Sequence, residues 1–243
     1  ADSYINRLVS NGHKVAICEQ MEDPKQAKGI VKREVIRVVT PGTNTDMASL
    51  NEAKNNYIMS IVYTEDKYGI ACDVTTGDFF TTEVDAERKL LDEVSRFNPS
   101  EIICNEAFYM SGIDVDDMKN RLSITVSALD SWYFSDGLAN ETLLSHFHVQ
   151  TINALGLEDY ESGVIAAGAL LKYLYETQMN SLDNILEIHP YSIGKYMIID
   201  SSSRRNLELV ETLREKQKRG SLLWVLDKTR TAMWSSLSSK RQR

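Results

Sequence analysis

Acidic side chains on a predicted hairpin come closest to a catalytic pattern in this sequence. Asp73 ends an apolar, strand-like run, and Asp78 follows a Thr-Thr-Gly turn. Two-metal nuclease chemistry needs three or four carboxylates that converge on the metal ions. Four further acids could supply them, although no spacing singles them out: Asp114, Asp116, Asp117 and Asp200. Two interpretations of Asp73 therefore stay open, as a metal ligand of a nuclease or as an acid of an exposed turn.

The histidine and cysteine positions do not match a metal site. His146 and His148 are two residues apart, but no second Cys or His pair lies near them. The three cysteines are far apart, and each lies beside an apolar residue: Cys18, Cys72 and Cys104. This pattern predicts buried, reduced thiols in a cytoplasmic protein. The sequence also has no G-x-x-x-x-G-K-S/T phosphate loop, so we expect no metal or cofactor in this chain.

Charge divides the chain into three blocks. Residues 1–43 carry seven Lys and Arg against five Asp and Glu, a charge of +2. Residues 44–200 carry nine against twenty-six (−17), and residues 201–243 carry eleven against four (+7). The acidic middle would repel phosphate, so it predicts a protein-docking module, whereas the two ends could meet DNA. A solvated helix face is the other interpretation of the basic C-terminal block.

The composition excludes two broad classes of protein. With 42% hydrophobic residues among 243, the chain has too much apolar content to be mainly disordered. The most apolar run, Val164 to Leu174, is about half the length that a helix needs to cross a bilayer. We therefore expect a globular protein with no contact with a membrane.

Residues 1–43 are predicted to form helix, strand, short helix and strand. Tyr4, Ile5, Leu8 and Val9 repeat at helical spacing, and residues 14–18 form a short apolar run. Asp23-Pro24 to Gly29 has the signals of a short helix. Residues 31–39 alternate in character, which places Arg33 and Arg37 on one side of a strand and Lys32 on the other.

Residues 55–135 are predicted to form an α/β layer. Three strands with tight turns between them, at 57–63, 69–74 and 79–84, predict an antiparallel meander. A helix capped by Asp85 should follow, with an apolar stripe made of Leu90, Leu91, Val94 and Phe97. Strands at 101–104 and 123–126 come after helical segments, which favours crossover connections.

The rest of the chain is predicted to be mainly helical. Helical spacing runs through 138–155, and 160–179 is a strong helix whose small residues permit close approach of a neighbouring element. Brief strands are expected at 185–188 and 196–199. A basic helix is expected over 204–219, with three apolar residues facing inward: Leu207, Val210 and Leu213.

Three long blocks of sequence carry a resemblance to a known family. They are VAICEQMEDP, AKG and REVIRVVTPGT within residues 15–43, DVTTGDF at 73–79, and RRNLEL with LLWVLDKTRTAM within residues 204–233. In this order, they closely resemble the MutS family of DNA mismatch repair proteins.

The resemblance implies an α/β fold. Its centre would be a ribonuclease-H-like connector domain with a mixed sheet flanked by helices. The expected divisions are the end of a mismatch-binding domain (1–43), a linker (44–54), the connector (55–190), the start of a helical lever domain (191–233) and a tail that departs from the family pattern (234–243).

For the intact protein, the resemblance implies ATP-regulated recognition of mispaired or unpaired bases in a DNA heteroduplex, a homodimer, and recruitment of MutL. The family's mismatch-reading Phe-x-Glu motif is expected upstream of Ala1, and the ATPase domain with ATP and Mg is expected far downstream. This chain is therefore expected not to be an enzyme by itself.

The resemblance also suggests site residues. Lys32, Arg33 and Arg37 are expected to touch the DNA backbone, although surface ion pairs would explain them as well. The residues expected to dock MutL lie on one helical stretch of the connector: Asn140, Glu141, Thr142, His146 and Gln150.

Two other functions remain open at this point. One is a ribonuclease-H-like, metal-dependent nuclease that uses Asp73. The other is a protein-interaction module without DNA affinity. DNA binding through Arg33 and Arg37 would weaken steeply as salt rises, which separates it from a pure interaction module.

Overall fold

The computed structural model describes residues 2–23, 30–44, 56–64, 67–74, 77–193, 201–215 and 217–226. The chain divides into two compact units, Ala1–Ile193 and Gly194–Arg243.

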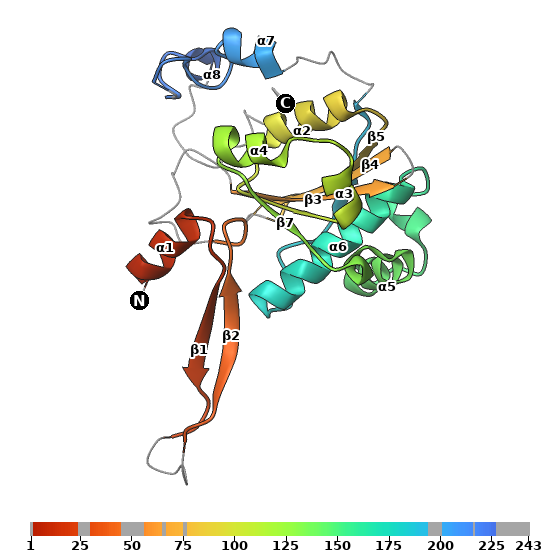
Figure 1. Ribbon diagram of the computed structural model, residues 1–243. Coiled ribbons are helices and arrows are strands. Elements are labelled where there is room, and N and C mark those ends of the chain that lie inside the picture. Colours follow the sequence, from red (N-terminus) through yellow and green to blue (C-terminus); the bar gives the residue numbers. More distant parts are fainter. Residues whose placement is uncertain are drawn as a thin grey trace. The chain divides into compact units, whose positions relative to one another are not determined.

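The first unit begins with a helix and a two-stranded sheet (Figure 1). Helix α1 (Asp2–Ser10) leads to β1 (Val15–Gln20), which pairs antiparallel with β2 (Arg33–Val39). Gly12 has a φ of +82°, which a residue with a Cβ rarely adopts, so it permits the turn after α1. The two predicted strands are confirmed, whereas the predicted short helix at 24–29 lies outside the described residues.

The rest of this unit is built on a mixed sheet of six strands, ordered β7-β6-β3-β4-β5-β8. The strands are β3 (Tyr57–Thr64), β4 (Lys67–Val74), β5 (Phe79–Val84), β6 (Glu101–Cys104), β7 (Thr125–Ala128) and β8 (Ile188–Pro190). The first three form the predicted antiparallel meander. Strands β6 and β7 continue the sheet parallel to β3, and β8 is parallel to β5.

Helices cover both faces of this sheet. They are α2 (Glu87–Phe97), α3 (Glu106–Met110), α4 (Val115–Leu122), η1 (Ser131–Phe134), α5 (Asp136–Phe147), η2 (Ile152–Leu155) and α6 (Glu161–Gln178). Ile58 of β3 packs with the apolar residues of α5 and α6, whereas its neighbour Met59 packs with those of α2, α3 and α4. Because successive strand residues point to opposite faces, this alternation produces two apolar cores and three layers.

Small residues allow α6 to approach its neighbours closely, as the sequence predicts. A Cβ on Gly168 would lie 2.3 Å from the Cα of Ala139 in α5. A Cβ on Gly69 of β4 would lie 1.9 Å from the carbonyl oxygen of Ser162 at the start of α6. Larger residues at these two positions would push α6 away from the sheet and from α5.

Two details of α2 differ from the prediction. Its N-cap is Ala86, with no side-chain cap hydrogen bond, and Asp85 instead accepts a hydrogen bond from Lys89 at 2.5 Å. Leu91 is 37% exposed, unlike Leu90. Successive helix residues are about 100° apart, so Leu91 points away from the face that Leu90 buries.

The second unit does not contain the predicted helix over 204–219. Helix α7 (Ser201–Asn206) ends early, and the next described helix is α8 (Leu222–Leu226). Glu208 has a φ of +48°, and its carbonyl oxygen accepts the backbone N–H of Leu222, so the chain turns back instead of continuing as a helix. The three residues predicted to face inward are exposed: Leu207, Val210 and Leu213. The predicted strand at 196–199 and the tail at 234–243 lie outside the described residues.

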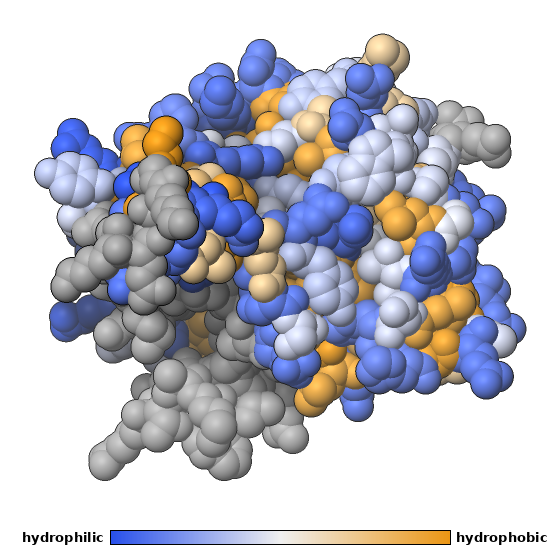
Figure 2. All heavy atoms as spheres, turned by 90° about the horizontal axis from the view of Figure 1, so that it is seen from below, coloured by the Kyte–Doolittle hydropathy of each residue, from blue (hydrophilic) through white to orange (hydrophobic). Residues whose placement is uncertain are grey.

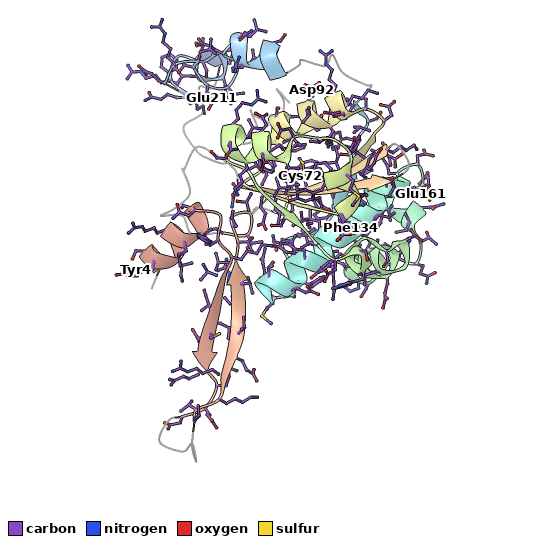
Figure 3. All side chains as sticks on the ribbon, in the orientation of Figure 1. Tyr4, Cys72, Asp92, Phe134, Glu161 and Glu211 are labelled. Carbon is purple, nitrogen blue, oxygen red and sulfur yellow. The ribbon has the colours of Figure 1, made fainter. Side chains whose placement is uncertain are left out.

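The three cysteines differ in accessibility, which corrects the prediction for one of them. Cys72 and Cys104 are buried, and Figure 3 labels Cys72 within the packed interior, but Cys18 is exposed on β1. None of the described helices is long and apolar enough to cross a membrane.

A brief treatment with a maleimide at about pH 8 should therefore modify Cys18 and spare the other two cysteines. Burial raises the pKa of the Cys104 thiol to about 12, so this thiol keeps its proton and lacks the nucleophilic thiolate form. Peptide mass spectrometry before and after unfolding in guanidinium checks the result. Modification of Cys104 in the folded protein at the rate of Cys18 would contradict the described packing.

Candidate functional site

The basic residues of β2 lie on an accessible strand of the two-stranded sheet. Arg33 is exposed and Arg37 is half-buried. The sequence predicts both on one side of the strand, but Arg37 pairs with Ile17 while Val35 pairs with Cys18, so a bulge at Ile36 interrupts the alternation. Arg33 and Arg37 therefore lie on opposite sides of the two-stranded sheet, and this part of the prediction is wrong. Four strand residues span about 13 Å, so the two guanidinium groups would reach different phosphates. The Arg37 side chain is anchored because its Nη2 donates to the carbonyl oxygen of Thr43 at 3.2 Å.

Lys32 has a partner that a phosphate would have to displace. Its Nζ lies 2.5 Å from Glu34 Oε1, and both side chains are exposed. The hydrogen bond to Glu34 and the charge of this carboxylate raise the pKa of Lys32, so the ammonium group stays charged. An exposed ion pair contributes little stability, because water and salt screen it, so Lys32 can still exchange Glu34 for an external anion.

The predicted partner-docking residues lie on α5 and just after it, but they do not form one accessible set. Glu141 and Gln150 are exposed, and Thr142 is half-buried. The amide Nδ2 of Asn140 donates to the backbone oxygen and to Oδ1 of Asp136, both at 2.9 Å. The side chain of Asn140 therefore already has partners within its own helix.

His146 has an internal structural role. Its Nε2 lies 2.9 Å from the carbonyl oxygen of Ile185, and its Nδ1 lies 2.6 Å from the hydroxyl of Tyr175 in α6. A carbonyl oxygen can only accept, so Nε2 carries a proton and donates, while the Tyr175 hydroxyl is the hydrogen-bond partner of Nδ1. Because both ring nitrogens are used, His146 holds α5 to α6 and offers no free nitrogen to a partner.

The structure does not bring the predicted acids together. Asp73 is buried at the end of β4. Asp114, Asp116 and Asp117 lie at the start of α4, which contacts β7, and two other strands of the sheet lie between β7 and β4. Asp200 lies outside the described residues. Within the described part of the chain, no three His, Cys, Asp or Glu side chains are placed to hold a metal ion.

Sequence reasoning misses one charged residue of structural importance. The apolar pattern of residues 101–104 predicts a strand and gives Glu101 no role, but its side chain is completely buried. It contacts both the segment that follows β2 and helix α6. A single acid in a short apolar strand is the signal that could have drawn attention to it.

On the face that Figure 2 presents, apolar side chains form separate spots among polar ones. Most of the accessible surface of a folded protein is contributed by apolar atoms, so scattered spots are the ordinary appearance of a surface that meets water. The charged residues are therefore the more informative part of this surface.

Two family descriptions match the chain. MutS domain I matches residues 1–48, and MutS domain II matches residues 56–186. The DNA mismatch repair protein MutS of Lachnoclostridium phytofermentans is 59% identical over 234 residues, which cover 96% of this chain and 25% of the relative. The DNA mismatch repair protein MutS of Ruminiclostridium cellulolyticum is 50% identical over 244 residues, which cover 99% of this chain and 28% of the relative. The protein of the same name in Clostridium tetani is 47% identical over 247 residues, which cover 98% of this chain and 26% of the relative. The chain thus spans about a quarter of the length of the curated relatives it matches.

Proposed function

Since this chain belongs to the MutS family of DNA mismatch repair proteins and spans its domains I and II, we propose that residues 1–43 contact the DNA backbone and residues 55–190 dock a protein partner. The observation that carries the proposal is the division of charge, +2 over residues 1–43 and −17 over 44–200. Phosphate is attracted to the first segment and repelled by the second, whereas a protein partner with a basic surface fits the second.

Lys32, Arg33 and Arg37 are the residues proposed to contact phosphate. Their support is positive charge, their position in β2 or directly before it, and the exposure of Lys32 and Arg33. Contacts of this kind fix the position of a protein on DNA without reading the bases. Backbone binding by these three residues is therefore expected to be the same for matched and mismatched duplexes.

For the whole protein, the proposal is recognition of mispaired or unpaired bases by a homodimer that is regulated by ATP and Mg and recruits MutL. Its support is the identity with relatives named DNA mismatch repair protein MutS. ATP would act in a region outside the two matched domains, which leaves this chain as a part without catalysis. The proposed location of the protein is the cytoplasm.

The fold proposed for residues 55–190 is the ribonuclease-H-like connector, and 191–233 would begin the lever domain. The meander of β3, β4 and β5, followed by crossovers to the parallel strands β6 and β7, supports the connector. Fold alone carries no activity, so this likeness adds no nuclease function.

MutL docking is proposed for the exposed side of α5 and the residues just after it, with Glu141 and Gln150 as the accessible polar residues. Replacing both with alanine should weaken MutL binding by about tenfold, since a few interface residues usually carry most of the affinity. Isothermal titration of the full chain with MutL measures this change.

Glu106→Ala provides the matched control for this experiment. Glu106 is also an exposed acid, but it lies on α3, whose Phe108 belongs to the core on the opposite face of the sheet from α5. MutL affinity should stay unchanged in this variant. Equal losses from both surfaces would mean that MutL responds to overall charge, and the proposed place of docking would then be wrong.

A further inference from the structure

A completely buried carboxylate joins the N-terminal segment to the six-stranded sheet. Glu101 is the first residue of β6, and its side chain has no exposed surface. Its Oε2 accepts from the Thr40 hydroxyl at 2.5 Å and from the Gly42 N–H at 3.1 Å. Its Oε1 accepts from the Tyr173 hydroxyl at 2.8 Å and lies 3.6 Å from Lys14 Nζ. Oε2 therefore accepts two hydrogen bonds, and Oε1 accepts one and lies beside an ammonium group.

These donors come from both sides of the junction. Lys14, Thr40 and Gly42 belong to the segment that contains β1 and β2, whereas Tyr173 belongs to α6. The Lys14 ammonium also lies 5.0 Å from the centre of the Tyr173 ring. Burial, and then the charge of Glu101, raise the pKa of Tyr173 far above its ordinary value, so the phenol keeps its proton and remains a donor. Removing Glu101 would leave several buried donors without an acceptor, which destabilises this contact in particular.

A second set of hydrogen bonds holds the same segment, from the residues directly before β3 and β6. Asn56 Nδ2 donates to the carbonyl oxygens of Pro41 at 3.0 Å and Asn44 at 3.1 Å. Ser100 in turn donates to Asn56 Oδ1 at 2.5 Å. A Cβ on Gly42 would lie only 2.8 Å from the Cβ of Ile58, so the segment lies directly against β3. The contact is close as well as polar.

We propose that Glu101 is a positioning residue that fixes the direction of β2 relative to the sheet. Thr40 directly follows the last residue of β2, and Arg37 donates to Thr43 within the same turn. On the other side, Tyr173 belongs to α6, which packs against α5. A series of hydrogen bonds thus runs from Arg37 to Tyr173 of α6, by way of Thr43, Thr40 and Glu101, and α6 in turn packs against the proposed docking helix α5. This inference deepens the proposed function, because it makes the geometry between the two surfaces depend on one buried acid.

Hydrogen exchange at the Gly42 amide tests the proposal. In the full chain, Glu101→Gln should lower protection of this amide by about 10- to 100-fold, because Gly42 loses a charged acceptor. Protection of the β3 amides should fall much less. Thr81→Val is the matched control. Thr81 is also completely buried, but it donates to Ile70 and Gly163 inside the sheet domain, by which we mean the six-stranded sheet and the helices that cover it. Equal loss of protection at Gly42 and β3 in Glu101→Gln would overturn the proposal.

A distance measurement separates positioning from stability. Spin labels on the exposed Cys18 of β1 and at position 106 of α3, in a Glu106→Cys background, report how β1 lies relative to the six-stranded sheet. The distance distribution should be narrow in the parent and in Thr81→Val, and should broaden in Glu101→Gln. Thr40→Val removes only one of the donors to Glu101, so it should broaden the distance distribution less. This variant provides the test if Glu101→Gln fails to fold. An unchanged distribution in a folded Glu101→Gln or Thr40→Val variant would overturn the proposal.

These readouts need no DNA, so the proposal can be judged apart from the proposed function. If Glu101→Gln broadens the distance distribution and the parent chain binds no DNA, the positioning role is supported and the proposed DNA contact is contradicted. If the parent chain binds DNA through β2 and Glu101→Gln leaves the distance distribution unchanged, the DNA contact is supported and the positioning role is contradicted.

Discussion

Replacing Lys32, Arg33 and Arg37 together with glutamine should reduce the affinity of the chain for duplex DNA by on the order of 100-fold at about 0.1 M salt. The slope of log affinity against log salt should become shallower by about 2–3, because each lost phosphate contact releases about one counterion fewer. The loss should be the same for every DNA sequence, since none of the three residues is expected to read a base. Fluorescence anisotropy over a range of salt concentrations measures both quantities.

A control variant carries the same change of net charge elsewhere. Lys67, Lys89 and Arg121 lie on the sheet domain, where each pairs with an acid. Changing these three to glutamine should leave the affinity for DNA almost unchanged, because they lie in the acidic part of the chain. If both triple variants lose affinity alike, DNA responds to overall charge and β2 is not the contact.

Replacing Gly168 with alanine should lower the free energy of unfolding of the sheet domain by about 2 kcal/mol. The new Cβ would lie 2.3 Å from the Cα of Ala139 and 2.5 Å from its Cβ, so the α5 backbone has to move. Alanine by itself favours a helix over glycine by about 1 kcal/mol, and this gain offsets only part of the strain. Unfolding in urea, followed by circular dichroism, gives the difference.

Gly137→Ala is the control for this explanation, because it should change the free energy of unfolding in the opposite direction. Gly137 lies at the start of α5, where a new Cβ would meet no atom within 4 Å, and the backbone there needs no positive φ. This variant should stabilise the domain by about 0.5–1 kcal/mol, because alanine loses less chain entropy on folding. Destabilisation by both variants would show that the close contact between α5 and α6 is not the reason.

The sheet could be predicted because its signals are local. Alternation and turn residues mark the meander of β3, β4 and β5, and the helix between β5 and β6 suggests the crossover that the structure contains. The predicted N-cap of α2 is wrong by one residue. Asp is a favoured N-cap residue and Ala is not, so the sequence indicates Asp85, but the backbone places Ala86 at the cap position. Local signals thus define elements better than they define their ends.

The predicted helix over 204–219 is wrong for a different reason. Its apolar spacing is compatible with a helix, but the positive φ of Glu208 and the bond from Leu222 to its carbonyl oxygen depend on contacts across the second unit. Nothing in a helical periodicity reveals such a turn.

The contacts of the buried Glu101 could not be predicted from the sequence, for a related reason. The partners of Glu101 lie far away along the chain, 61 residues from it at Thr40 and 72 residues at Tyr173. The basic residues in and beside β2 are easier to identify, because their charge is visible in the sequence itself, although the bulge in β2 is not. Long-range polar contacts of single residues are the part of the site that a lone sequence does not show.

Phosphate contacts of the N-terminal segment are the central element of the proposed function. The most direct test is one titration series of the chain with matched and mismatched duplexes of equal length across a range of salt concentrations. We expect weak binding that falls steeply as salt rises and is equal for the two duplexes. Binding that prefers the mismatched duplex, or that is indifferent to salt, would contradict these contacts.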